Sequence, residues 1–310
     1  MFSLVVPIYN EEKLIDELLK RTIPAVESFT SDFELIFVDD GSTDNSLSVL
    51  LTWQKREKRL RIISLSKNFG HQAAFTAGLE FSKGDYIAMM DGDLQDPPEV
   101  LADMYLKITR EGFDIVSGRK AGSKGKKNRT LFSSLFHLFF RNMGEMKEIG
   151  NYGNFSMMTR NALSALLSLK EKVRYLPGMR TYVGFKQGDV EFVRDERYEG
   201  RPKMSFLKLF RLASDAIFSF SKFPLRLCLV LGIIGTIVFM AAGIYVVIAK
   251  IYGFAPIGWS SILLSIYFLG SIQLLFLGVL GEYIYRNYKE SQNRPVYFVK
   301  QCFESPSEKK

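Results

Sequence analysis

The chain has 310 residues, of which 47% are hydrophobic, and its net charge is +8. A chain of this length can bury a sizeable core and typically forms about two domains. Its two cysteines and two histidines are too few for a disulfide framework or a histidine-based metal site. The positive charge suits nucleic acid, an anionic membrane surface or a phosphate-bearing substrate. The first residues lack the segments of a signal peptide, so we expect none.

Short apolar runs alternate with segments of helical periodicity in the first 120 residues. We expect strands at residues 2–8, 34–38, 60–65, 85–90 and 114–117, and helices at 11–29, 44–55, 69–81 and 97–110. This alternation predicts an α/β fold with a mainly parallel sheet and helices on both faces. Ligands of such sheets bind beyond the carboxyl ends of the strands. The acidic clusters Asp39–Asp40 and Asp91–Asp96 lie at two of these ends.

The tripeptide Asp91-Gly92-Asp93 directly follows the fourth predicted strand. Two carboxylates this close can share a divalent cation, and Mg²⁺ and Mn²⁺ prefer carboxylate and phosphate oxygens. A cation held there would neutralise a departing diphosphate. An isolated Asp-x-Asp is weak support, because turns are rich in Asp and Gly. Its position after a strand makes the metal interpretation stronger.

Two uncharged apolar stretches, Leu227–Ala249 and Trp259–Gly281, predict transmembrane helices. Each has about 23 residues, or roughly 34 Å as a helix, against a hydrocarbon core of about 30 Å. Basic residues flank the pair on both outer sides, which places both flanks in the cytoplasm. We therefore expect a cytoplasmic catalytic domain at 1–204, two spans within 225–285 and a cytoplasmic tail at 286–310.

The segment at 205–224 is expected to lie in the membrane interface. Within Ser205–Lys222, apolar and charged residues occupy different helical faces. The alternative is a soluble amphipathic helix packed on the core. Leu131–Phe140 has a similar composition. For the lysines between Arg119 and Arg129, a solvated basic loop or attraction to anionic lipid is the alternative to a role in meeting anionic substrates.

Several short motifs follow one another in a fixed order along the chain. They are residues 5–11 (VVPIYNE), 37–44 (FVDDGSTD), 66–70 (SKNFG), 90–99 (MDGDLQDPPE), 218–221 (FSFS), 224–226 (PLR), 280–284 (LGEYI) and 294–297 (RPVY). With these motifs the chain resembles glycosyltransferase family 2, and within it the polyprenyl-phosphate glycosyltransferases, such as the bactoprenol glucosyltransferases and dolichol-phosphate mannosyltransferase. The resemblance covers nearly the whole chain.

This resemblance implies a GT-A-type fold and a set of site residues. The nucleotide-sugar donor would contact Pro7, Tyr9, Glu11, Asp39, Asp40, Asp91, Asp93, Gln95, Arg201 and Lys203. The metal ligands would be Asp91 and Asp93, and the acceptor phosphate would meet Arg119, Arg129 and Ser133. Fixed cations are needed where two anionic substrates meet, so these roles are chemically coherent.

The sequence departs from the family at Asn154. Many relatives have Gly-Asp-Phe-Arg-Leu where this chain has Gly153-Asn154-Phe155-Ser156-Met157. The acidic residue there is a candidate base, and an amide cannot act as one. A phosphate acceptor is already mostly ionised near neutral pH, because its second pKa is about 6. Our hypothesis is therefore that Asn154 positions a substrate and that the enzyme remains active.

The expected reaction transfers a sugar, with inversion, to undecaprenyl or a related polyprenyl phosphate, assisted by Mg²⁺ or Mn²⁺. We take UDP-glucose as the expected donor, with GDP-mannose and modified UDP-sugars as alternatives. The resemblance is consistent with a homo-oligomer in the cytoplasmic membrane. A processive polysaccharide synthase is the first competing interpretation, but the chain lacks a Gln-x-x-Arg-Trp motif. A non-catalytic membrane scaffold and a nucleic-acid-binding protein are the other competing interpretations. Because the basic residues cluster beside the membrane segments, the membrane accounts for the positive charge better than nucleic acid does.

Overall fold

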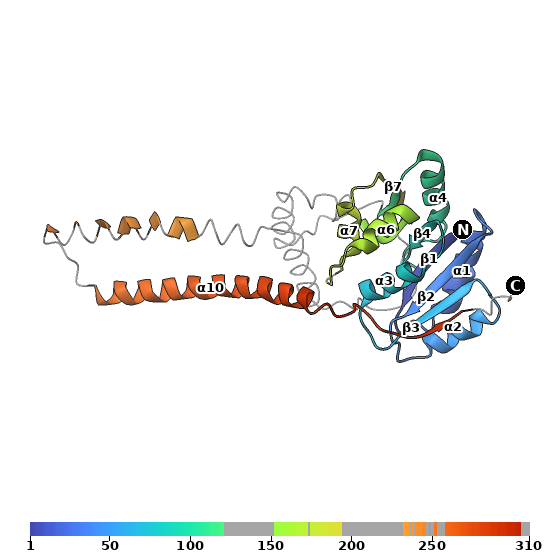
Figure 1. The fold of residues 1–310 in the computed structure, drawn as a ribbon, viewed down its shortest axis with the longest axis horizontal. Helices are drawn as coiled ribbons and strands as arrows, with labels where there is room; N and C mark the ends of the chain where they lie inside the picture. The colour runs from blue at the N-terminus through green and yellow to red at the C-terminus, as the bar shows by residue number, and fades with distance from the viewer. Residues whose placement is uncertain are drawn as a thin grey trace. The chain divides into compact units, whose positions relative to one another are not determined.

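The computed structural model describes residues 1–120, 152–172, 174–193 and 258–304, with short stretches between 232 and 252 (Figure 1). It divides into two units, Met1–Lys203 with Pro295–Lys310, and Met204–Arg294. Several sequence predictions lie outside the described residues: the helices at Leu131–Phe140 and Ser205–Lys222, and the site residues Arg129, Ser133, Arg201 and Lys203.

An eight-stranded mixed sheet with the order β7-β5-β6-β4-β1-β2-β3-β8 forms the first unit. Its parallel block consists of β1 (Phe2–Ile8), β2 (Phe33–Asp39), β3 (Leu60–Leu65) and β4 (Tyr86–Met89). Strand β6 (Tyr152–Thr159) is antiparallel to β4 and to β5 (Ile115–Lys120), and β7 (Gln187–Phe192) is parallel to β5. The carboxyl ends of the four parallel strands therefore lie at the same end of the sheet.

Helices cover both faces of this sheet, as predicted (Figure 1). One face carries α1 (Ile15–Glu27), α2 (Ser46–Gln54) and α4 (Val100–Glu111). The other carries α3 (His71–Phe81), α6 (Arg160–Ser168) and α7 (Leu176–Tyr182). Successive strand residues point to opposite faces, so Leu4 and Val6 enter the first layer while Val5 enters the second.

Helix α1 begins at Ile15, four residues later than the sequence pattern predicts. The backbone N–H groups of Glu11 and Glu12 donate instead to the Ser46 hydroxyl, at 2.9 Å, and to Asp44 Oδ2, at 3.2 Å. These bonds hold the residues after β1 in a loop against the loop after β2. Tertiary contacts here override the local helical preference.

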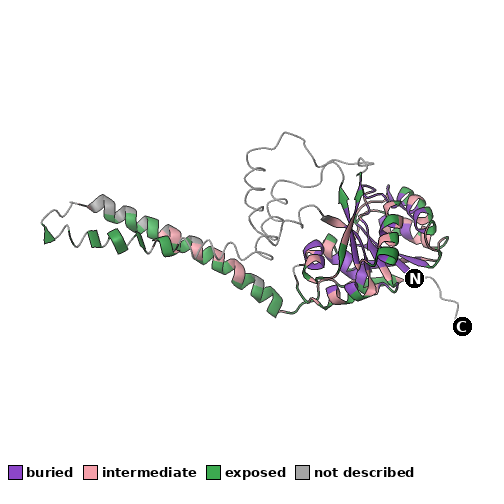
Figure 2. Cartoon of the chain, turned by 90° about the horizontal axis from the view of Figure 1, so that it is seen from above, coloured by how far each residue is buried: buried purple, intermediate pink, exposed green. Residues whose placement is uncertain are grey.

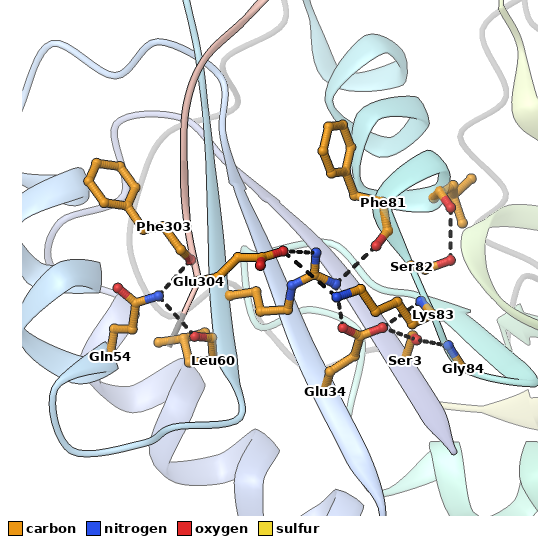
Figure 3. A network of polar contacts seen from close by, with 12 residues as sticks. Ser3, Glu34, Gln54, Leu60, Phe81, Ser82, Lys83, Gly84, Phe303 and Glu304 are labelled. Atoms are coloured by element: carbon orange, nitrogen blue, oxygen red, sulfur yellow. Dashed lines mark hydrogen bonds and ion pairs between the residues drawn. The ribbon is translucent and has the colours of Figure 1, made fainter. Parts of the chain in front are cut away.

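The residues after the long helix that ends at Ser291 return to the sheet. Strand β8 (Val299–Phe303) pairs antiparallel with β3, although the sequence predicted only a tail. Gln54 Nε2 donates to the carbonyls of Phe303 and Leu60, at 2.7 and 3.1 Å (Figure 3). The strand therefore covers the β3 edge, which would otherwise present unpaired backbone groups.

A buried ion pair lies beside this edge. Arg61 Nη1 donates to Glu34 Oε2 at 2.5 Å, and Arg61 Nη2 donates to Glu304 Oε1 at 2.8 Å. Glu34 also accepts bonds from the Ser3 hydroxyl and the Lys83 N–H, both at 2.6 Å (Figure 3). Glu304 thus connects the segment after β8 to Arg61 of β3 and, through it, to Glu34 of β2.

The described part of the second unit is dominated by α10 (Trp259–Ser291), a helix of 33 residues and so about 50 Å long. Its large apolar side chains are mostly exposed (Figure 2). Among the described residues, this is the one helix long and apolar enough to cross a membrane. Part of the other predicted span, Leu227–Ala249, lies outside the described residues, and Gly232–Ala242 includes a shorter apolar helix.

Candidate active site

Two aspartates at the end of β2 organise the neighbouring loops. Asp39 accepts the Ser42 N–H at 3.0 Å and the Ser64 hydroxyl at 3.1 Å. Asp40 accepts the N–H groups of Phe69 and Gly70, at 2.8 and 2.9 Å. Burial raises the pKa of Asp40, and these two N–H bonds oppose that rise. Carboxylate oxygens can accept further bonds, so both aspartates retain capacity for a ligand.

Glycine is required beside each acidic cluster. Gly41 has a φ of +66°, and a Cβ there would lie 2.5 Å from the Lys67 carbonyl carbon. A Cβ on Gly92 would lie 2.9 Å from the Pro7 carbonyl oxygen. The loop after β2 packs closely on the loop after β3, and the loop after β4 packs closely on the end of β1, only because these positions lack side chains.

Asp91 and Asp93 lie in a tight turn directly after β4. The Gln95 N–H donates to Asp93 Oδ1 at 3.2 Å, and Leu94 has a left-handed φ of +58°. Both aspartate side chains are partly exposed, whereas Gln95 and Asp96 are buried. The turn thus holds two accessible carboxylates beside the carboxyl ends of β1 and β4, as the sequence predicts.

His71 joins this acidic cluster, although the sequence, with only two histidines, predicted no site that contains one. Its Nε2 lies 2.9 Å from Asp91 Oδ1. Burial lowers the pKa of His71, but the bond to Asp91 and the charges of Asp93 and Asp40 outweigh burial and raise it. His71 begins α3, directly after the Ser-Lys-Asn-Phe-Gly motif at the end of β3. That position was the available sign that it reaches the site.

The predicted donor-binding residues Pro7, Tyr9 and Glu11 lie at the end of β1 and in the loop after it. Pro7 is buried in the strand, Tyr9 is exposed and Glu11 is partly buried. Asn10, between them, has a φ of +54°, and its Oδ1 accepts the Thr43 N–H at 2.8 Å. The loop after β1 is therefore fixed against the loop after β2, close to Asp39 and Asp40.

Asn154 is held by two residues that the sequence did not single out. Gln72 Nε2 donates to Asn154 Oδ1 at 3.1 Å. Arg180, fully buried, donates from Nη1 to the Asn154 carbonyl oxygen at 3.1 Å and from Nη2 to the Gly153 carbonyl oxygen. Burial lowers the pKa of Arg180 to about 10, which leaves it charged near neutral pH.

A small pocket brings these residues together with the acidic turn. It is lined by Asp91, Asp96, Gly118, Lys120, Gly153, Asn154, Phe155 and Phe192. Arg119, the predicted phosphate ligand, does not line it. Its guanidinium contacts Asp189 and Glu191 of β7, at 2.9 and 2.5 Å. A phosphate role for Arg119 stays a prediction, and it requires the guanidinium to exchange these carboxylates for phosphate.

The family follows from the sequence profile of glycosyl transferase family 2, which matches residues 3–167. The chain belongs to this family. It is a glycosyltransferase, and its mixed, mostly parallel sheet with helices on both faces is the GT-A α/β fold. The predicted family resemblance and enzyme class are confirmed.

Three similar proteins align with nearly the whole length of this glycosyltransferase. The uncharacterised glycosyltransferase YkcC of Bacillus subtilis is 38% identical, with 97% of this chain and 94% of the relative covered. The uncharacterised glycosyltransferase sll0501 of Synechocystis is 36% identical, with 96% and 94% covered. A prophage bactoprenol glucosyl transferase homologue of Escherichia coli is 35% identical, with 96% and 98% covered.

Solved structures are more distant from this glycosyltransferase. Glucosyl-3-phosphoglycerate synthase of Mycobacterium tuberculosis, in complex with Mn²⁺, UDP and phosphoglyceric acid, aligns at 20% identity with a TM-score of 0.47, covering 70% of this chain and 74% of that one. The mannosyltransferase PcManGT of Pyrobaculum calidifontis, in complex with GDP-Man and Mn²⁺, aligns at 19% with a TM-score of 0.46, covering 64% and 57%. Neither likeness is close enough to bear on substrate or metal.

Proposed function

We propose that this glycosyltransferase transfers a sugar from a nucleotide-sugar donor to a polyprenyl phosphate at the cytoplasmic membrane. The observation that carries this proposal is the 35% identity with the bactoprenol glucosyl transferase homologue over 96% of the chain. That match includes the catalytic unit and α10, whose exposed apolar side chains suit a lipid environment. We propose UDP-glucose as the donor, with undecaprenyl phosphate as the acceptor.

The acidic turn fits a divalent metal bound together with a diphosphate. Asp91 and Asp93 offer hard oxygen ligands on partly exposed side chains, and Asp40 is close enough to act on the same histidine. The described residues contain no group of three or more His, Cys, Asp or Glu side chains arranged to hold a metal alone. Magnesium typically takes one or two carboxylates and completes its shell with phosphates and water, which this turn allows. When bound, the metal would neutralise charge on the departing nucleoside diphosphate.

Displacement at this site needs no base from the protein. The acceptor phosphate is already largely ionised near neutral pH and can attack the anomeric carbon directly. A single attack of this kind inverts the anomeric centre. The residues of the chain then act by orientation and by electrostatic stabilisation, which can lower the barrier by several kcal/mol. Asn154 lines the pocket beside Asp91, which fits a role in orientation.

Asp93→Asn tests this function in the full-length protein in detergent. We expect the wild type to convert undecaprenyl phosphate into a lipid-linked sugar when given UDP-glucose with Mg²⁺ or Mn²⁺. Asp93→Asn should lower this rate at least about a hundredfold, because the turn loses a ligand charge at the leaving group. Radiolabelled sugar in the lipid phase measures the product, and a panel of UDP- and GDP-sugars identifies the donor.

Asp103→Asn makes the same chemical change at an exposed position on α4 and serves as the matched control. It should retain the wild-type rate. Wild-type activity in Asp93→Asn would refute the metal assignment. The absence of lipid-linked product with every nucleotide sugar, with and without metal, would refute the proposed function itself.

A further inference from the structure

Asn154 has one polar group that the described protein leaves without a partner. Its Oδ1 accepts from Gln72 Nε2 at 3.1 Å, and its backbone carbonyl accepts from Arg180 and from the Ser156 hydroxyl, at 3.1 and 2.9 Å. Among the described residues, no hydrogen-bond partner is present for Nδ2. Asn154 is only partly buried and lines the pocket beside Asp91.

The orientation of the Asn154 amide follows from a chain of donors that begins at the backbone. The Leu176 N–H can only donate, and it donates to Gln72 Oε1 at 3.1 Å. Gln72 must therefore turn its Nε2 donor toward Asn154, and Asn154 must accept this bond with its Oδ1. Turning both amides end for end would place Gln72 Nε2 against the Leu176 N–H, two donors facing each other, and would lose that bond. The free Asn154 group is thus an NH₂ donor and not an oxygen.

The surroundings of this donor favour an anionic oxygen as its partner. Arg180 places a fully buried positive charge behind Gly153 and Asn154, and the partners that the structure gives it are carbonyl and hydroxyl oxygens. Lys120 lines the same pocket. A phosphoryl oxygen at neutral pH only accepts hydrogen bonds, so it matches a group that only donates. The carboxylates of Asp91 and Asp96 in this pocket limit such a site to an anion that arrives with its own counter-charge.

We propose that Gln72 is a positioning residue that fixes the Asn154 side chain so that its NH₂ donates to a phosphoryl oxygen of a substrate. The inference rests on the proposed function for the identity of that substrate, which is either the donor diphosphate or the acceptor phosphate. It gives the amide a role of its own where many family members have an acid, because Asn154 supplies a hydrogen-bond donor to an anion.

Ligand-induced thermal stabilisation of the full-length protein in detergent tests this role without requiring turnover. One arm uses UDP with Mn²⁺, and the other uses undecaprenyl phosphate with Mn²⁺, so that each anion has a counter-charge. We expect each to raise the Tm of the wild type. Gln72→Glu keeps the bond from Leu176 but cannot donate to Asn154, so the Asn154 amide turns its oxygen toward the pocket. The apparent affinity for one of the two ligands should fall about tenfold or more.

Asn154→Asp removes the same donor by a route that keeps the Gln72 contact, since a carboxylate oxygen accepts the Gln72 bond. It should weaken binding of the same ligand, and by more than Gln72→Glu does, because it also adds negative charge. Gln72→Glu should have no further effect in a protein that already carries Asn154→Ala, because Gln72 acts through Asn154. Gln301→Glu, at an exposed position on β8, is the matched control and should bind both ligands normally.

The ligand whose binding is lost identifies the source of the phosphoryl oxygen. Wild-type affinity for both ligands in Asn154→Asp would overturn the proposal, whatever the stability of Gln72→Glu. So would a failure of both ligands to stabilise the wild type, or a full further loss from Gln72→Glu on the Asn154→Ala background. A wild type that binds either ligand but transfers no sugar would refute the proposed function and leave the positioning role standing.

Discussion

Asp44 connects the two loops that carry the predicted donor contacts. Its Oδ1 accepts the Ser46 N–H at 3.0 Å and its Oδ2 accepts the Glu12 N–H at 3.2 Å. Burial alone would raise the pKa of Asp44, but bonds from Ser46 and Glu12 outweigh burial and lower the pKa below its ordinary value of 3.8. A carboxylate with a depressed folded-state pKa stabilises the fold above its unfolded pKa. That stability is lost as the pH falls through the folded-state pKa.

We expect Asp44→Asn to lower the free energy of unfolding by about 1 kcal/mol near neutral pH, because an amide can accept only one of the two bonds. The difference from the wild type should shrink as the pH falls below 3.8, where the wild-type carboxylate takes up a proton. Denaturant unfolding in detergent at both pH values measures this, with Asp103→Asn as the control. A difference that stays constant down to the lower pH would contradict the argument.

Residues adjacent to strand ends could be placed from the sequence, whereas residues placed by tertiary packing could not. Asp39 ends β2 and Asp91 follows β4, so parallel strand order alone brings them to the same end of the sheet. His71 and Gln72 reach Asp91 and Asn154 across 20 and 82 residues of sequence. Those contacts depend on how α3 sits on the sheet, which no local pattern reports.

At the scale of the element, β8 shows the same limit. Its sequence, Val-Lys-Gln-Cys-Phe, is short and largely exposed, so it carries no clear strand pattern. The partner strand, β3, was predicted at Leu60–Leu65 and is found there, because its apolar run is buried on both faces. Edge strands of this kind are specified by long-range pairing, and the pairing here joins residues more than 200 positions apart.

The ion pairs beside β8 differ in what their loss should cost. Arg61→Met leaves the Glu34 carboxylate buried without its cation, and we expect a loss of about 3–5 kcal/mol in unfolding free energy. Glu304→Gln removes the exposed partner of Arg61 and should cost less than about 1 kcal/mol. Denaturant unfolding in detergent compares the two variants. Equal losses would show that burial of Glu34 is not what makes Arg61 important.

At the scale of the whole molecule, the pairing of β8 with β3 constrains how the chain meets the membrane. The two strands belong to one sheet, and β8 follows α10 while β3 precedes it by more than 190 residues. If α10 crosses the membrane, β8 can reach β3 only when the chain crosses an even number of times. We therefore propose a second span before α10, and the uncharged stretch Leu227–Ala249 is the candidate that the sequence offers.

Cysteine labelling in intact cells tests this topology. In a protein carrying Cys228→Ser, the exposed Cys302 of β8 should react with a membrane-impermeant maleimide only after the membrane is permeabilised. Ala255→Cys, added between the two proposed spans to a protein that also carries Cys302→Ser, should react without permeabilisation, because the flanking positive charges keep both outer ends in the cytoplasm. Labelling of Cys302 in intact cells would place β8 outside the cytoplasm. Since β8 and β3 share a sheet, the whole catalytic unit would then have to lie there too, away from any cytoplasmic supply of nucleotide sugar.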